Sequence, residues 1–285
     1  MTSNTRKLYS YTGGNQEELC KYIDSLIAGK IWLSCPRGLN DPFELIGAVE
    51  FPEVLGHQED RPDIYKIYLR SCLREGAVRP LLLPNELFTD LTPILNSDSS
   101  QPFSVAYLQR RLASLLTSNL NRIGLKCFTN DPLSTLMWAH YGKNYSGFCV
   151  EYEANLDTYE QQTKYLLEDV IYTTARQRLT LNEALFCNSA AIRKTMLTKG
   201  AEWAYERECR LITTSPMNVT AGAKGELRDL PAWLSVSTIY LGQNLPSCCR
   251  TRLEGYVKDN SGIELAKVMA SSLKFALDAH FRPKP

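Results

Sequence analysis

The sequence lacks the features that mark membrane-spanning, secreted and strongly charged proteins. Among its 285 residues, no apolar run approaches the ~18 residues that a membrane-spanning helix needs. Residues 1–14 carry no apolar signal core, so we expect a cytoplasmic protein with no membrane partner. The 32 basic and 31 acidic side chains give a formal net charge of +1. This balance excludes the non-specific attraction to nucleic acid that a strongly basic chain would show.

The signatures of several enzyme classes are also missing. The sequence contains neither the Gly-rich P-loop of many nucleotide-binding proteins nor the G-x-G-x-x-G turn of the dinucleotide fold. The G-x-S-x-G turn of hydrolases and the H-E-x-x-H zinc helix are absent too. With three histidines and no C-x-x-C pair, no metal site is expected. Nine cysteines at scattered positions indicate reduced, non-catalytic thiols.

The spacing of apolar residues predicts a single α+β domain over residues 1–285. Strands are expected at about 8–11, 31–34, 123–128, 147–152, 169–172, 207–213, 238–241 and 264–269. Helices are expected after Asn15, over residues 134–141, from about 181 to 196, and after Pro246. Because strands and helices do not alternate strictly, we expect one mixed or antiparallel sheet with flanking helices. Residues 53–120 are predicted to form a helical insertion.

Two segments combine a tight turn or a short helix with polar and aromatic side chains. Asn40-Asp41-Pro42-Phe43 fixes a turn, because the first two side chains bond local backbone and proline sets φ. This turn is either purely structural or the edge of a pocket. Leu136 to Tyr141 holds Trp138 and His140, and Tyr145 follows closely. Such a helix either packs into the core or forms the wall of a site for a flat heteroaromatic ligand.

A third segment, Tyr205 to Ile212, concentrates charge. If it is a strand, Glu206, Glu208 and Arg210 point to the same face. One interpretation is a solvated edge, since charged side chains on strands are usually exposed. The other is that Arg210 lies between two carboxylates in a pocket and keeps one of them ionised and oriented.

Together these segments resemble domain-of-unknown-function (DUF) family 2971, a bacterial family that often neighbours abortive-infection and phage-defence genes. The matching stretches are Leu8-Tyr9-Ser10-Tyr11, Leu39 to Phe43, Cys127-Phe128-Thr129, Leu136 to Tyr141, Gly147 to Tyr152 and Trp203 to Arg210. Their order in turn resembles the ADP-ribosyltransferase superfamily, in which a late strand carries an [EQ]-x-E motif. Glu206-Arg207-Glu208 fits that motif. Ser10 stands where a basic residue is usual, and Lys7, Arg6 or Arg210 would have to replace it.

The second resemblance implies an ADP-ribosyltransferase-like fold and NAD as the substrate. Glu208 would stabilise the oxocarbenium-like centre that forms when the nicotinamide–ribose bond breaks, and Glu206 would position the acceptor. The cofactor-binding residues would be Tyr9, Tyr11, Trp138, His140, Tyr141 and Arg210, with Arg210 or Arg37 at the pyrophosphate. Such a protein would be a toxin or effector in phage defence or interbacterial conflict. It would modify an unknown protein or nucleic-acid acceptor, under the control of a regulatory or antitoxin protein.

Two other functions remain open from the residues. The aromatic surface could belong to a non-enzymatic sensor or protein-binding module. Alternatively, Asp41, Asp131, Glu206 and Glu208 could surround Mg²⁺ in a metal-dependent nuclease, which requires that two or three carboxylates converge. A cleft that joins Tyr9, Trp138 and Glu208 would favour the transferase, whereas a flat apolar patch would favour the binding module.

Overall fold

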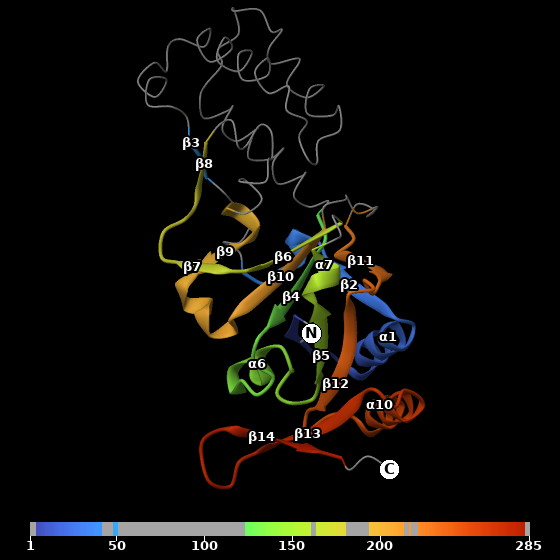
Figure 1. Cartoon of the computed structure of the whole chain (residues 1–285). Helices are drawn as coiled ribbons and strands as arrows, with labels where there is room; N and C mark the ends of the chain where they lie inside the picture. Colours follow the sequence, from blue (N-terminus) through green and yellow to red (C-terminus); the bar gives the residue numbers. More distant parts are fainter. Residues whose placement is uncertain are drawn as a thin grey trace, which may run out of the picture.

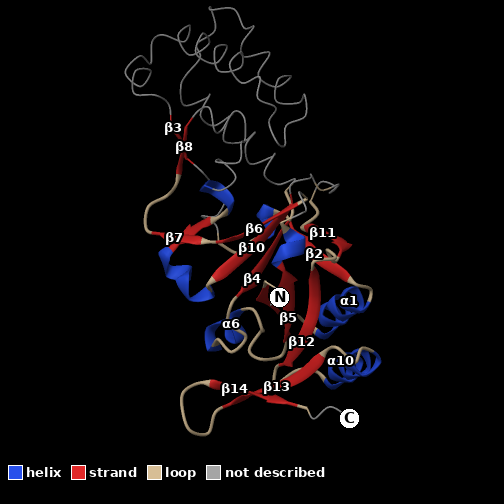
Figure 2. Ribbon diagram, viewed as in Figure 1, coloured by secondary structure: helices blue, strands red, loops and turns tan. Residues whose placement is uncertain are grey.

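A ten-stranded, mostly antiparallel sheet forms the centre of the described chain (Figures 1 and 2). The computed structural model describes residues 4–41, 48–50, 123–160, 164–180, 194–213, 217 and 222–282. Eight strands follow in sheet order as β11 (Gly225–Asp229), β2 (Lys30–Ser34), β4 (Leu125–Thr129), β1 (Thr5–Thr12), β5 (Phe148–Asn155), β12 (Leu234–Leu241), β13 (Glu264–Ala270) and β14 (Leu277–Phe281). The remaining two are β10 (Glu208–Thr213), which pairs with β4, and β6 (Tyr165–Asp169), which pairs with β10. The predicted α+β class is confirmed.

Within the described ranges, few helices flank this sheet. They are α1 (Gln16–Ile27), α6 (Thr135–His140), α7 (Leu156–Tyr159) and α10 (Ser247–Asp259), with the 3-10 helices η1 (Pro36–Gly38) and η2 (Ala201–Glu206). Two parallel strand pairs lie outside the main sheet, β3 (Ala48–Glu50) with β8 (Arg178–Thr180) and β7 (Ile171–Thr173) with β9 (Thr198–Gly200). Figure 1 shows α1 and α10 side by side. In the part of the chain that the structure describes, no helix is both long and apolar enough to cross a membrane.

Helix α1 begins and ends where the sequence predicts. The Asn15 side chain accepts a hydrogen bond from the Glu18 N–H, and the Glu18 carboxylate accepts one from the Asn15 N–H. This reciprocal pair satisfies two backbone donors that the first helical turn leaves open. After the last turn, Gly29 adopts φ of +65°, a left-handed conformation that costs glycine little. The helix therefore presents its buried apolar side to the sheet in a fixed register.

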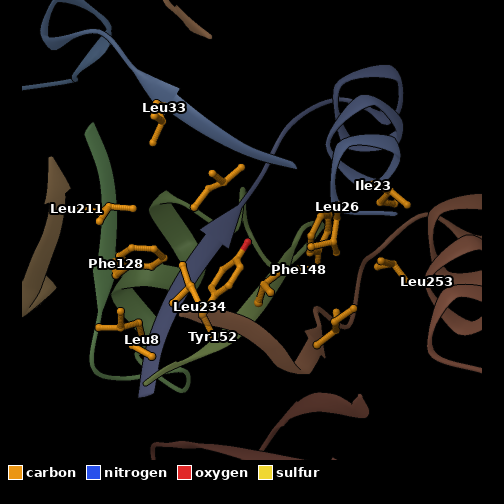
Figure 3. Close-up of a cluster of buried hydrophobic side chains, with 14 of the residues drawn as sticks. Leu8, Ile23, Leu26, Leu33, Phe128, Phe148, Tyr152, Leu211, Leu234 and Leu253 are labelled. Carbon is orange, nitrogen blue, oxygen red and sulfur yellow. The ribbon is translucent and has the colours of Figure 1, made fainter. Parts of the chain in front are cut away.

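The main hydrophobic core lies between one face of the sheet and the pair formed by α1 and α10. Figure 3 shows side chains from both layers gathered there, among them Leu8, Phe128, Tyr152, Ile23 and Leu253. Because side chains alternate along a strand, the neighbours of these core residues point to the other face. A second buried cluster, which includes Tyr9, Trp138 and Cys149, occupies that face. Strand β1 thus contributes to both clusters.

Strand β4 is the place where two parts of the sheet meet. Along one edge it pairs with β10 over its whole length. On its other edge, β1 pairs with it through Tyr9 and Thr129, and β2 pairs with it through Ser34 and Leu125. Each of these two ladders consists of that single pair. Strands β1 and β2 therefore diverge from each other, and the segment 126–128 of β4 lies at the gap between them.

Two predicted strands differ from the structure, and two strands were missed. The strand expected at 169–172 is two strands, β6 and β7, which are separated at Val170. The strand expected from Arg207 begins at Glu208, because Arg207 has φ of +45° and cannot continue the extended backbone. The strands β11 and β14 were not predicted. The insertion at 53–120, Phe43, and most of the helix at 181–196 lie outside the described residues.

Candidate functional site

A pocket of about 300 Å³ lies in the gap between β1 and β2, with β4 at its back. Strands β1 and β10 both reach it beside Thr129, which pairs with Tyr9 on one side and with Glu208 on the other. The expectation that Tyr9 and Glu208 share one cleft is confirmed. Its lining is Tyr9 to Gly13, Tyr22, Trp32, Ser34, Gly38 to Asn40, Lys126 to Thr129, Met137, Tyr141, Lys199, Glu206, Glu208 and Arg210.

Glu208 and Arg210 form a buried ion pair at one end of this pocket. The Arg210 guanidinium donates from Nε to Glu208 Oε1 at 2.8 Å and from Nη2 to Oε2 at 2.9 Å. Its Nη1 donates to the carbonyl oxygen of Met196 at 2.7 Å. The side chains of Arg210 and Glu208 are 0% and 4% exposed. The interpretation of this strand as a solvated edge is therefore wrong.

Lys199 completes the charge network and was not among the predicted site residues. Its Nζ donates to Glu206 Oε2 at 2.6 Å and lies 3.4 Å from Glu208 Oε2. The ammonium also lies 4.7 Å above the Trp203 ring. Two buried carboxylates need two cations, and Arg210 supplies only one of them. In the sequence, the excess of acidic charge in Glu206 and Glu208 over Arg210 was thus the signal for a further basic residue nearby.

Glu206 reaches the same network from a different element than predicted. It is the last residue of η2 rather than part of strand β10, and the left-handed turn at Arg207 separates the two. Glu206 Oε1 accepts a hydrogen bond from the Tyr141 hydroxyl at 2.5 Å, and Asn40 Nδ2 donates to that hydroxyl at 3.0 Å. Because of the turn, Glu206 and Glu208 approach one ammonium from two directions instead of standing side by side on a strand.

The surroundings of the two carboxylates move their pKa values in opposite directions. Burial alone would raise the pKa of Glu208, but Arg210 and Lys199 outweigh this effect and lower it to about 2. Burial raises the pKa of Glu206 above its usual value, although Lys199 and the Tyr141 hydroxyl oppose the shift. Two carboxyl groups whose pKa values are pushed apart are suited to different roles in one reaction. Glu208 stays ionised, and Glu206 can exchange a proton.

Replacing Tyr141 tests the pKa of Glu206 directly. Tyr141→Phe removes a hydrogen-bond donor from the ionised Glu206, so the pKa of Glu206 is expected to rise further above its usual value. A carbon-detected NMR titration of the glutamate carboxyl groups measures this shift. Tyr205→Phe is the matched control, because Tyr205 lies next to Glu206 in the chain but does not line the pocket. An unchanged or lower Glu206 pKa in Tyr141→Phe would contradict the assigned hydrogen bond.

Two of the predicted aromatic residues do not line the pocket. Trp138 is fully buried behind it, donates from Nε1 to the Pro132 carbonyl at 2.9 Å and packs edge-on against Tyr11 at 5.2 Å. His140 is exposed, and its ring centroid lies 6.2 Å from that of Tyr205. Trp138 therefore supports the pocket wall through Tyr11. The cleft joins Tyr9 and Glu208 as predicted, but Trp138 stands outside it.

The acidic residues considered for a nuclease site do not gather in the described chain. Asp131 Oδ1 accepts from the Leu133 N–H at 2.8 Å and so stabilises a local turn. Lys199 occupies the position between Glu206 and Glu208 where a cation would have to sit. Asp41 and Asp131 are not among the residues that line the pocket. This arrangement gives no support to two-carboxylate metal chemistry.

Three cysteines meet where α1 contacts α10. The sulfur atoms of Cys20, Cys248 and Cys249 lie within 4.8 Å of one another. Among the described residues, this spacing would allow the three thiols to hold a metal ion. Their sequence positions gave no sign of this, because Cys20 lies far from the adjacent pair. None of the three lines the pocket. Cys149 is buried, and burial raises its thiol pKa well above the usual value, which suits a core residue rather than a nucleophile.

Comparison with known proteins adds one finding. No curated protein and no solved structure matches the chain. A family model described as a protein of unknown function (DUF2971) matches residues 137–211. This stretch contains Tyr141, Lys199, Glu206, Glu208 and Arg210, which are the charged end of the pocket and its hydrogen-bonded tyrosine. Over residues 137–211 the chain is thus similar to the DUF2971 family, as the sequence motifs predicted.

Proposed function

We propose that this protein breaks the bond between nicotinamide and ribose in NAD and transfers ADP-ribose to an acceptor, as ADP-ribosyltransferases do. One observation carries the proposal. An ionised carboxylate and a carboxyl group of raised pKa, Glu208 and Glu206, lie at the same end of one pocket. Cleavage of a glycosidic bond needs such a pair, because positive charge develops on the sugar while a proton leaves the attacking group.

In this mechanism Glu208 faces the ribose of NAD. When the bond between ribose C1′ and the pyridinium nitrogen breaks, the nitrogen keeps the electron pair and nicotinamide departs as a neutral molecule. The positive charge left on the ribose is stabilised by the Glu208 carboxylate. Arg210 holds this carboxylate through two hydrogen bonds, so it need not reorient during the reaction. Arg210 is a positioning residue, because its own donors are directed to Glu208 and Met196.

Glu206 acts on the acceptor in the same step. An acceptor hydroxyl attacks C1′ and gives its proton to Glu206, whose raised pKa makes it a better base than an ordinary surface carboxylate. Tyr9, Tyr11 and Tyr141 supply aromatic walls for the nicotinamide ring. The acceptor is a protein or a nucleic acid, and the biological role is that of a toxin or effector in phage defence or interbacterial conflict, under the control of a partner protein.

Incubation of the full chain with NAD labelled in the nicotinamide ring tests this function. We expect release of free nicotinamide and, with NAD labelled in the adenine, a labelled acceptor in a bacterial extract. Below the pKa of Glu206 the rate should fall as the pH falls, because protonated Glu206 cannot accept a proton. Absence of nicotinamide release under all conditions, with and without extract, would reject the proposal.

A second candidate function, a protein-binding module, is favoured by one surface feature. The turn between β13 and β14 carries Leu273 and Phe275, whose side chains are almost completely exposed. Exposed apolar side chains of this size often mark contacts with other proteins. The two functions are compatible, since the turn contributes no residue to the pocket.

A further inference from the structure

Lys126 lies in the middle of β4, at the gap between β1 and β2. Residues of β4 alternate between the two faces of the sheet, so Lys126 shares the face of Phe128 and not that of Cys127. It lines the pocket, and it also lines an adjoining hollow of about 30 Å³ together with Thr12, Tyr22 and Trp32. The lysine therefore stands at the opposite side of the sheet from the network around Glu208.

The ammonium of Lys126 has no carboxylate partner among the described residues. Lys199, at the other end of the pocket, lies between two carboxylates. Lys126 has no such ion pair with any described residue. Burial lowers the pKa of its ammonium, and the thiols of Cys127 and Cys149 oppose this shift without cancelling it. A desolvated ammonium without a counter-ion is unfavourable, and proteins rarely retain one by chance. A ligand that brings negative charge to this position would remove the penalty.

The charges that line the pocket support the same conclusion. Five charged side chains line it, three of them basic and two acidic. Lys199, Arg210, Glu206 and Glu208 balance one another within hydrogen-bonding distance. The remaining positive charge belongs to Lys126. A ligand that spans the pocket thus meets polar, charge-balanced groups at one end and an uncompensated cation at the other.

The two arginines that the sequence suggested for the pyrophosphate are occupied elsewhere. Arg210 directs its guanidinium to Glu208 and to the Met196 carbonyl. Arg37 donates from Nε and Nη2 to the carbonyl oxygen of Ala223. Lys126 lines both the pocket and the hollow beside it, together with the aromatic side chains of Tyr22 and Trp32. Aromatic rings beside a cation are a common setting for the base and phosphate of a nucleotide.

We propose that Lys126 binds the pyrophosphate of a dinucleotide substrate, and that Tyr22 and Trp32 flank its adenine base. The ligand then passes through the gap in the sheet, with its ribose at Glu208 and its phosphates at Lys126. This subsite rests on the proposed function for the identity of the ligand. The anion site itself rests on the position of Lys126 and on the fact that no carboxylate of the described residues pairs with it.

Calorimetric titration of the full chain with ADP-ribose and with adenosine tests the subsite, since the second ligand lacks phosphate. Lys126→Met is expected to weaken ADP-ribose binding by roughly 10- to 100-fold and to leave adenosine binding unchanged. Lys126→Arg keeps the charge and should retain most of the affinity. Lys21→Met is the matched control, because Lys21 is exposed on α1 next to Tyr22 and pairs with Glu17.

The variant also has a stability readout that needs no ligand. Since methionine replaces a partly buried ammonium that no described carboxylate pairs with, Lys126→Met should melt at or above the wild-type temperature. If it fails to fold, Lys126→Gln takes its place in the titration. If Lys126→Met, or Lys126→Gln in its place, binds ADP-ribose as tightly as the wild type does, the subsite is overturned, whether or not the wild type releases nicotinamide.

The failure of the proposed function gives a different result. A protein that binds ADP-ribose through Lys126 but releases no nicotinamide has the anion site without the activity. A wild type that binds neither ADP-ribose nor inorganic pyrophosphate has no anion site at Lys126, and this outcome also rejects the subsite.

Discussion

Glu208→Gln is expected to lower the rate of nicotinamide release by two to four orders of magnitude. Glutamine keeps the shape of the side chain and can still bond a ribose hydroxyl, so NAD binding should change little. The developing positive charge on the ribose loses its counter-ion, and electrostatic contributions of roughly 3–5 kcal/mol to the barrier account for a loss of this size. Single-turnover measurement of nicotinamide release separates this chemical step from binding.

The interpretation of Glu208→Gln depends on the integrity of the fold. Arg210 is fully buried and bonded to both carboxylate oxygens, so loss of the charge will also cost stability. Rates should therefore be compared per folded molecule, as measured by circular dichroism. Glu202→Gln is the matched control, since Glu202 is an exposed glutamate of η2 that does not line the pocket. Full turnover by folded Glu208→Gln would show that Glu208 is not the reacting carboxylate.

Arg210→Met is expected to have the largest effect on stability, a loss of about 3–5 kcal/mol in the free energy of unfolding. The substitution leaves Glu208 buried with Lys199 as its remaining cation and leaves the Met196 carbonyl without the guanidinium donor. An unpaired buried charge costs far more than the pair contributes, because water cannot replace the missing partner. Urea unfolding followed by tryptophan fluorescence measures the difference.

The chain contains a matched control for this substitution. Arg228 pairs with Glu226 two residues before it on strand β11, just as Arg210 pairs with Glu208 on β10. The side chains of Arg228 and Glu226 are 24% and 20% exposed. Arg228→Met should cost less than about 1 kcal/mol, as is usual for ion pairs near the surface. Equal losses in both variants would mean that burial does not set the strength of the pair around Glu208.

The pH dependence of stability gives a second check on Arg210→Met. In the wild type, the folded-state pKa of Glu208 lies at about 2, below its usual value of 4.5. The depressed pKa contributes stability that is present in full above about 4.5 and is lost as the pH falls through about 2. Removal of Arg210 takes away most of this depression. The difference between wild type and Arg210→Met should therefore shrink as the pH falls from about 4.5 to about 2.

Local signals in the sequence predicted much of the fold. The capping residues Asn15 and Glu18 predict α1 because their hydrogen bonds are short-range and depend on few neighbours. The same holds for Ser134, whose hydroxyl caps α6. Strands β11 and β14 were missed, because edge strands carry little periodic pattern of their own. Strand β11 also gains its hydrogen bonds from a distant partner, β2, whereas β14 pairs with the neighbouring strand β13.

The candidate site, too, was predicted only where local sequence signals place its residues. Glu208, Arg210 and Tyr9 lie on strands whose alternation could be read from the sequence. The position of Glu206 depends on a left-handed turn at Arg207, and arginine gives no sign of such a turn. Lys199 and Lys126 enter the site through tertiary contacts alone. Basic residues of this kind are common on any surface, and only the fold distinguishes these two.

The pocket is assembled from segments that are made at very different times. Strand β1 has its long ladder with β5, which lies beyond the long stretch from residue 51 to residue 122. Closing so large a loop is slow, because its entropy is lost before the strand pairs contribute. During synthesis, Tyr9 has no ladder partner until Thr129 of β4 is made, its long ladder waits for β5, and Glu208 follows only with β10. The pocket therefore stays incomplete until about three quarters of the chain has been made, and the activity proposed for it can begin only after that point.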